Sequence, residues 1–287
     1  MSTQRRRWIR RVGLVLVVAV VAPLTTVVGV ADAALLATEG RSGTLVLAPG
    51  ASGSVTVNCR SSAWGAVSGG FSAAVANDVL ISASQPSPLS NGWSVSAVNL
   101  TTTTQTVQVL ALCAVIDGRV VRSRTALVAP TASPDVTATC PAGTTSTGGG
   151  HRIDPVNGLP VVSSRPAANG SGWTVNAFNV TAASRTVTAF TVCAVFNGRQ
   201  VTATNTNLEP GTAKTVTATC PTNKVAIGGG WAHGGGVRWL VDRAMQQSVA
   251  GFPVHFVNNT TTVRFGVTAF VVCSSVGPIP SAPPPAG

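Results

Sequence analysis

Charged side chains are scarce in this chain. Asp, Glu, Lys and Arg together make up 9% of its 287 residues, where about 25% is usual for a soluble domain. The net charge of +11 is scattered along the sequence, whereas a nucleic-acid-binding protein carries a clustered basic stripe. We therefore expect no nucleic-acid partner, although a sparse positive charge would favour anionic polymers of a cell surface.

Motifs of catalytic and metal sites are also missing. The sequence has no H-x-H, H-E-x-x-H or C-x-x-C for a metal, no G-x-x-x-x-G-K for nucleotide phosphates, and no G-x-S-x-G nucleophile elbow. We therefore expect a non-enzymatic protein without metal or cofactor. The alternative hypothesis is a hydrolase of envelope polymers that uses Asp78, Asp154 and Asp242, which lie in or near loops that differ between the repeats described below.

The two ends of the chain differ from the rest. Residues 1–33 combine an Arg-rich start, an uncharged run from Val12 to Ala31 and the cleavage-type sequence Ala31-Asp32-Ala33, which together predict a cleaved export signal. The paired arginines leave general and twin-arginine export both open. Residues 277–287 are rich in proline and predict a disordered tail. The mature chain is expected to be secreted, extracellular or associated with the cell envelope, with no stable membrane span.

One segment occurs twice in almost identical form. VTATCPAGTTSTGGGH begins at Val136, VTATCPTNKVAIGGGW begins at Val216, and a more divergent copy, VTVNCRSSAWGAVSGGF, begins at Val55. Recurrence at a fixed period is typical of a reused supersecondary unit. The sequence therefore predicts three tandem copies of about 80 residues, covering 34–119, 120–199 and 200–276.

Short runs rich in Val and Thr, bounded by Gly, Pro, Asn and Ser, predict strands throughout. We expect five strands in each copy and an all-β fold. The glycine clusters 68–70, 148–150 and 228–230 are expected just after a strand, where a positive φ or close backbone approach is needed. Trp93, Trp173 and Phe252 share one repeat position and are expected in the core.

Six cysteines in an exported chain predict disulfides. Two pairings fit a threefold repeat. One joins the cysteines within each copy, as Cys59–Cys113, Cys140–Cys193 and Cys220–Cys273. The other joins neighbouring copies and closes a ring through Cys59–Cys273. We favour the first pairing, because it makes each copy a self-contained unit.

The arrangement of the copies is predicted from their turns. Asp117-Gly118 and Asn197-Gly198 are typical of type I′ hairpins, so each Cys-bearing strand is expected to pair with the opening strand of the next copy. The first opening strand, at Gly43–Leu47, should then pair with the last Cys-bearing strand and remove a sheet edge. This predicts a pseudo-threefold closed body, β-prism-like or small propeller-like. Three disulfide-stapled β-sandwich beads are the alternative.

The repeat pattern CP-G-----GGG … SRP … GW-V-A-N … VTAF-VCA resembles tandem Cys-paired β repeats of uncharacterised secreted proteins from high-GC Gram-positive bacteria. The resemblance covers nearly the whole mature chain, and copy 1 departs from it at Arg60 and Ser68. It implies secretion and a repeat architecture, and it brings no established activity.

Candidate binding residues lie after the glycine clusters, where a shared scaffold carries loops that differ between copies. An exposed Trp there could stack on a sugar ring, so we expect a structural or adhesive module that binds cell-wall or extracellular polysaccharide. The candidates are His151, Arg152, Asp154 and Asn157 in copy 2, and Trp231, His233, Arg238 and Trp239 in copy 3.

Five asparagines begin N-x-S/T sequences that elsewhere accept glycans. They are Asn99, Asn169, Asn179, Asn258 and Asn259. Because the leader and composition are of bacterial type, we interpret them as turn residues.

Overall fold

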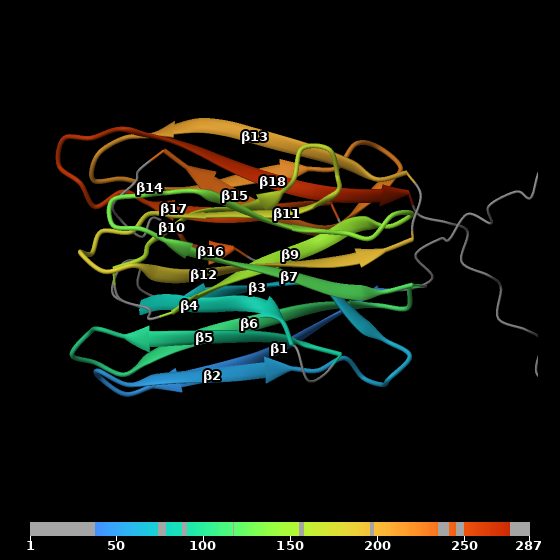
Figure 1. The fold of residues 1–287 in the computed structure, drawn as a ribbon, viewed down its shortest axis with the longest axis horizontal. Helices are drawn as coiled ribbons and strands as arrows, with labels where there is room; N and C mark the ends of the chain where they lie inside the picture. The colour runs from blue at the N-terminus through green and yellow to red at the C-terminus, as the bar shows by residue number, and fades with distance from the viewer. Residues whose placement is uncertain are drawn as a thin grey trace, which may run out of the picture. The chain divides into compact units, whose positions relative to one another are not determined.

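Eighteen strands and no helix make up the part of the chain that the computed structural model describes, which confirms the all-β prediction (Figure 1). The described residues are 38–73, 79–87, 91–116, 118–154, 158–195, 198–234, 241–244 and 250–275. No helix suited to crossing a bilayer occurs among them. The predicted export signal and proline-rich tail lie outside the described residues.

Each copy contributes six strands. Copy 1 contains β1 (Thr38–Leu47), β2 (Ser52–Val57), β3 (Gly65–Ala73), β4 (Val79–Pro86), β5 (Trp93–Asn99) and β6 (Gln105–Ala114). Copy 2 contains β7 (Val120–Val128), β8 (Asp135–Thr139), β9 (Thr145–Asp154), β10 (Val161–Pro166), β11 (Gly172–Ala177) and β12 (Arg185–Ala194). Copy 3 contains β13 (Gln200–Leu208), β14 (Ala213–Thr219), β15 (Lys224–His233), β16 (Val241–Ala244), β17 (Gly251–Val257) and β18 (Phe265–Ser275).

The third strand of each copy, β3, β9 or β15, is additional to the five that were predicted. It carries the glycine cluster, so the clusters lie within strands and not after them. Propensity argues against a glycine-rich strand, because glycine has no side chain to pack. The glycines are needed for close approach, since none of them has a positive φ. A Cβ at Gly149, for example, would collide with the Phe190 carbonyl and the Trp173 ring.

Three six-stranded sheets are shared between the copies in a pseudo-threefold arrangement. Their strand orders are β1-β6-β3-β16-β17-β14, β2-β5-β4-β9-β12-β7 and β13-β18-β15-β10-β11-β8. Each sheet thus combines three strands of one copy with three of another, and the cycle closes because copy 1 pairs with copy 3. The predicted prism-like body is confirmed. The copies are not independent beads, since every sheet crosses from one copy to another.

Short antiparallel contacts join the copies within each sheet. β4 pairs with β9 through Ala83↔Arg152 and Ser84↔His151, and β10 pairs with β15 through Ser163↔Ala232 and Ser164↔Trp231. The third joint, between β3 and β16, has the same form. A glycine precedes the first paired residues of β9 and β15, because a side chain at Gly150 or Gly230 would meet the carbonyl of Ser84 or Ser164.

The predicted closure through the first and last strands is wrong. β1 pairs along its whole length with β6 of its own copy, and β18 takes β13 as its partner. β7 likewise pairs with β12 and not with β6. Each copy therefore owns its opening strand, and the ring is closed instead by the β3–β16 joint.

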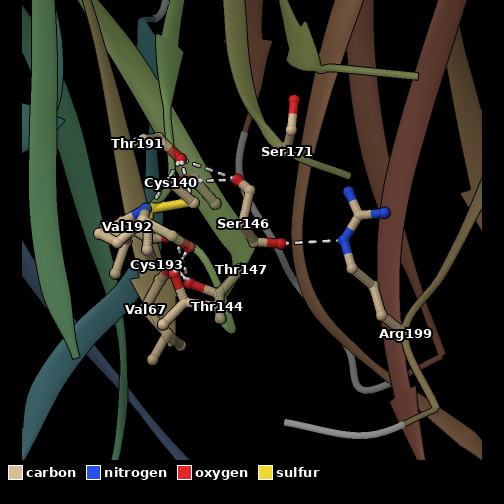
Figure 2. The surroundings of a disulfide bond; sticks show 12 residues. Val67, Cys140, Thr144, Ser146, Thr147, Ser171, Thr191, Val192, Cys193 and Arg199 are labelled. Atoms are coloured by element: carbon tan, nitrogen blue, oxygen red, sulfur yellow. Dashed lines mark hydrogen bonds between the residues drawn. A yellow bond between two sulfur atoms is a disulfide. The ribbon is translucent and has the colours of Figure 1, made fainter. Parts of the chain in front are cut away.

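The turns that suggested hairpins do have left-handed glycines, with φ of 63° at Gly118 and 69° at Gly198. They send the chain across to the next sheet and do not return it beside the Cys-bearing strand. The arginine after each glycine secures this crossing. The Nε of Arg119 donates to the Ala66 carbonyl at 2.9 Å, and that of Arg199 donates to the Ser146 carbonyl at 3.0 Å (Figure 2).

The disulfides join cysteines within each copy, as predicted: Cys59–Cys113, Cys140–Cys193 and Cys220–Cys273. The first cysteine of each pair follows β2, β8 or β14, and the second lies on β6, β12 or β18. These strands belong to different sheets. Each disulfide therefore links the two sheets to which its copy contributes.

The shared aromatic position lies in the core, as predicted, since Trp93, Trp173 and Phe252 are at most 1% exposed. The indole of Trp173 donates from Nε1 to Ser164 Oγ at 2.9 Å, and Trp93 bonds to Ser84 in the same way at 3.0 Å. In copy 3 both partners change together, because Phe252 has no N–H and the residue equivalent to the serine is Ala244.

This covariation predicts a measurable coupling. Ser164→Ala should cost about 2 kcal/mol, because it leaves a buried indole N–H without an acceptor. Trp173→Phe removes that donor, so the serine acceptor is no longer needed. The double variant should therefore be more stable, by about 1 kcal/mol or more, than the sum of the two single losses predicts. Urea unfolding of the wild type, both single variants and the double variant measures the coupling. Strictly additive losses would contradict it.

Candidate functional site

The three glycine-rich strands, β3, β9 and β15, contact one another at the pseudo-threefold axis. Thr147 Oγ1 donates to the Val67 carbonyl across this contact at 2.8 Å. A Cβ added at Gly148 would lie 2.8 Å from the Ser68 Cβ, and one added at Gly228 would lie 2.9 Å from Ser68 Oγ. The axis therefore has room for one side chain, which explains why only copy 1 has serine at this position.

Three rings follow the glycines and lie near the same axis. They are Phe71, His151 and Trp231, all at most 5% exposed. The His151 ring meets Trp231 edge-on, with 6.4 Å between centroids and an interplanar angle of 87°. His233 stacks on Trp231 at 5.8 Å and 2°. The structure thus brings three of the predicted site residues together, from two different copies.

His151 is held neutral by its surroundings. Burial lowers the pKa of His151 to about 4, and a hydrogen bond with the Ile81 backbone opposes this shift only in part. The Nδ1 atom has no hydrogen-bond partner within the described part of the chain. His151 lines a small cavity together with apolar side chains: Phe71, Val79, Ile81, Val161, Trp231 and Val241. At neutral pH the imidazole is a packing group.

The expected sugar-stacking role of Trp231 is wrong, because this ring is 5% exposed and cannot reach a ligand in solution. His233 is equally buried, and its Nε2 lies 3.2 Å from the Val161 carbonyl. Arg152 and Asp154 are exposed on β9. The other predicted site residues, Asn157, Arg238 and Trp239, lie outside the described residues, so their proposed role stays a prediction.

The described residues give little support to the alternative hydrolase hypothesis. Asp154 is exposed, Asp78 lies outside the described residues, and the same is true of the Asp242 side chain. No group of three His, Cys, Asp or Glu side chains that could hold a metal ion occurs in the part of the chain that is described. The catalytic use of these carboxylates stays an untested prediction.

Three of the five N-x-S/T asparagines are turn residues, as predicted, and they are fully buried: Asn99, Asn179 and Asn258. Asn179 shows the arrangement. Its Nδ2 donates to the carbonyls of Val128 at 2.9 Å and Ala183 at 2.8 Å, and its Oδ1 accepts from Thr181 N and Oγ1. With every donor and acceptor used internally, these carboxamides are not available for modification.

An open depression of about 540 Å³ lies on the solvent-facing side of copy 3, over β13, β15 and β18. Two cross-strand rows of side chains form it. The first row is Asn205–Thr268–Ala232, and the second is Asn207–Gly266–Gly234. Its end, at His233-Gly234, is where β15 leads into the loop after the glycine cluster. Its size falls within the usual range of ligand sites.

Sequence reasoning missed this depression, because it searched for aromatic and charged residues. The available signal was the loss of side chains in one copy. Gly266 stands where copies 1 and 2 have Thr106 and Thr186, and Ala232 stands where copy 2 has Arg152. A comparison of the three copies along the outer strand face would have identified it.

No model of a known protein family matches the chain, and no curated protein matches it significantly. The resemblance to secreted repeat proteins therefore stays a prediction. Function rests on the geometry described above.

Proposed function

We propose that the chain is a secreted, non-enzymatic protein of the cell envelope or extracellular space, a structural or adhesive module that binds polysaccharide. The depression on copy 3 carries this proposal. It offers exposed carboxamides and a hydroxyl on a rigid sheet, and hydroxyl-rich ligands need such paired donors and acceptors.

The scaffold supports the same function. Three disulfides are consistent with an oxidising compartment outside the cytosol. Each disulfide fixes two sheets relative to each other, so the outer strand faces are presented with little conformational freedom. A rigid surface loses less entropy on binding than a mobile one.

The test uses the mature chain, starting at Ala34 and folded with its disulfides. Incubation with isolated bacterial cell envelopes and with a glycan array should retain the folded protein. The control is the same chain after reduction and alkylation, which should lose retention. If the folded protein is retained neither by envelopes nor by any glycan, the binding function is refuted.

A further inference from the structure

The outer face of copy 3 differs from the equivalent faces of the other copies. In copy 2 the corresponding rows are Thr125–Thr188–Arg152 and Leu127–Thr186–Asp154. In copy 1 the first row is Thr44–Gln108–Ser72, and Val46–Thr106 begins the second. Among the described rows, only copy 3 combines two glycines and an alanine with two asparagines, so we place the depression on this copy.

The lining of the depression contains no Asp, Glu, Lys or Arg side chain. Asn205 and Asn207 are exposed, and Thr268 is half-buried. Their side chains make no hydrogen bond within the part of the chain that is described, so their donors and acceptors are open to a ligand. Each carboxamide offers both a donor and an acceptor, which matches the dual character of a sugar hydroxyl.

Two cations near the depression make other contacts. Lys214 Nζ donates to Thr206 Oγ1 at 3.1 Å, and Arg264 lies 3.8 Å from Glu209 as a surface pair. Thr206 alternates with Asn205 and Asn207 along β13, so the Lys214 contact lies on the face of the strand opposite to the two rows. An ion placed on a surface without opposite charge loses hydration without compensation. Among the described residues, no Lys or Arg side chain lines this site.

We infer that copy 3 carries a single binding site for an uncharged, hydroxyl-rich glycan chain, and that copies 1 and 2 carry none. This inference rests on the proposed polysaccharide-binding function and specifies its ligand class and location. One chain should bind one oligosaccharide, even though the scaffold is threefold.

The structure suggests a double substitution that fills the depression on copy 3 without disturbing the fold. Asn207→Leu/Gly266→Thr gives copy 3 the residues that copy 2 carries at Leu127 and Thr186. A Cβ added at Gly266 meets nothing within 4 Å, and this glycine does not have a positive φ. The matched control is the reverse change in copy 2, Leu127→Asn/Thr186→Gly.

Affinity electrophoresis at pH 7 compares dextran, laminarin and mannan, which are neutral, with anionic polygalacturonate. We expect retardation by at least one neutral polymer, a loss of at least tenfold in affinity in the copy 3 variant, and no change in the copy 2 control. Titration of the wild type with the matching oligosaccharide should give one site per chain. Circular dichroism melts confirm that both variants fold.

The other outcomes separate the two proposals. If neutral polymers bind equally to the wild type and the copy 3 variant, the assigned site is wrong and the proposed function stands. Salt-resistant binding to polygalacturonate alone overturns the uncharged ligand class, and three sites per chain overturn the restriction to copy 3. Failure to bind any of these polymers, glycan arrays or cell envelopes removes the proposed function itself.

Discussion

Gly150→Ala should destabilise the protein by about 4 kcal/mol, because the added methyl group meets the closest backbone clash of any described glycine. The added Cβ would lie far inside van der Waals contact distance of the Ser84 carbonyl, with the Gln85 Cα 3.1 Å away. All of these atoms are backbone, so no side chain can rotate to make room. The substitution therefore separates β4 from β9, the strands that join copies 1 and 2 in one sheet.

Guanidinium chloride unfolding, followed by tryptophan fluorescence, measures this loss. Gly266→Ala is the matched control, because it makes the same change in a strand where the added Cβ meets nothing within 4 Å. It should be neutral or slightly stabilising, since alanine restricts the unfolded chain more than glycine does. Equal effects of the two substitutions would show that the joint between copies is not closely packed.

The folded protein should lose about 3 kcal/mol of stability through His151 between pH 6.5 and pH 4. Burial lowers the pKa of His151 to about 4 in the folded state, whereas an unfolded histidine titrates near 6.5. Between these values the unfolded chain binds a proton that the folded chain does not. The contribution of His151 is therefore complete above about pH 6.5 and falls as the pH drops through this window.

His151→Phe tests this directly, because Phe71 occupies the equivalent position in copy 1. The wild type and the variant are unfolded with urea at several pH values from 4 to 7. The variant should gain relative to the wild type as the pH falls, and the difference should be constant near pH 7 and should change less steeply as the pH approaches 4. The control variant is His255→Asn, which introduces the residue that copy 2 has at the equivalent position, Asn176. Its stability should keep the pH dependence attributed to His151. A constant difference between wild type and His151→Phe across this pH range would refute the assignment.

The depression on copy 3 and the axis are linked through His233. This residue borders the depression and stacks on Trp231. Its Nε2 lies 3.2 Å from the carbonyl of Val161 on β10, the strand that joins copy 2 to copy 3. Ligand binding above His233 should therefore be visible in the fluorescence of the buried Trp231, which gives the titration a natural probe.

Several features of this protein were available from the sequence alone. The spacing of the repeated segments predicted three copies. The repeat also left two cysteine pairings, and the one favoured because it makes each copy self-contained is the one that the structure contains. Alternation of apolar and polar residues predicted the strands and the buried position of Trp93, Trp173 and Phe252. These properties depend on the spacing and alternation of residues along the chain, which can be read directly from the sequence.

Strand pairing between copies was decided only by the tertiary structure. The opening strands and the Cys-bearing strands are alike in all copies, so the sequence cannot tell whether β7 belongs beside β6 or beside β12. The choice depends on where β4 and β9 can approach, and this requires Gly150 to face the Ser84 carbonyl. The same packing buries Trp231, a ring expected at the surface, and leaves Asn205 and Asn207 on the proposed binding face. Because glycine contributes through the space it leaves for other residues, its role becomes visible only when the neighbouring strand is in place.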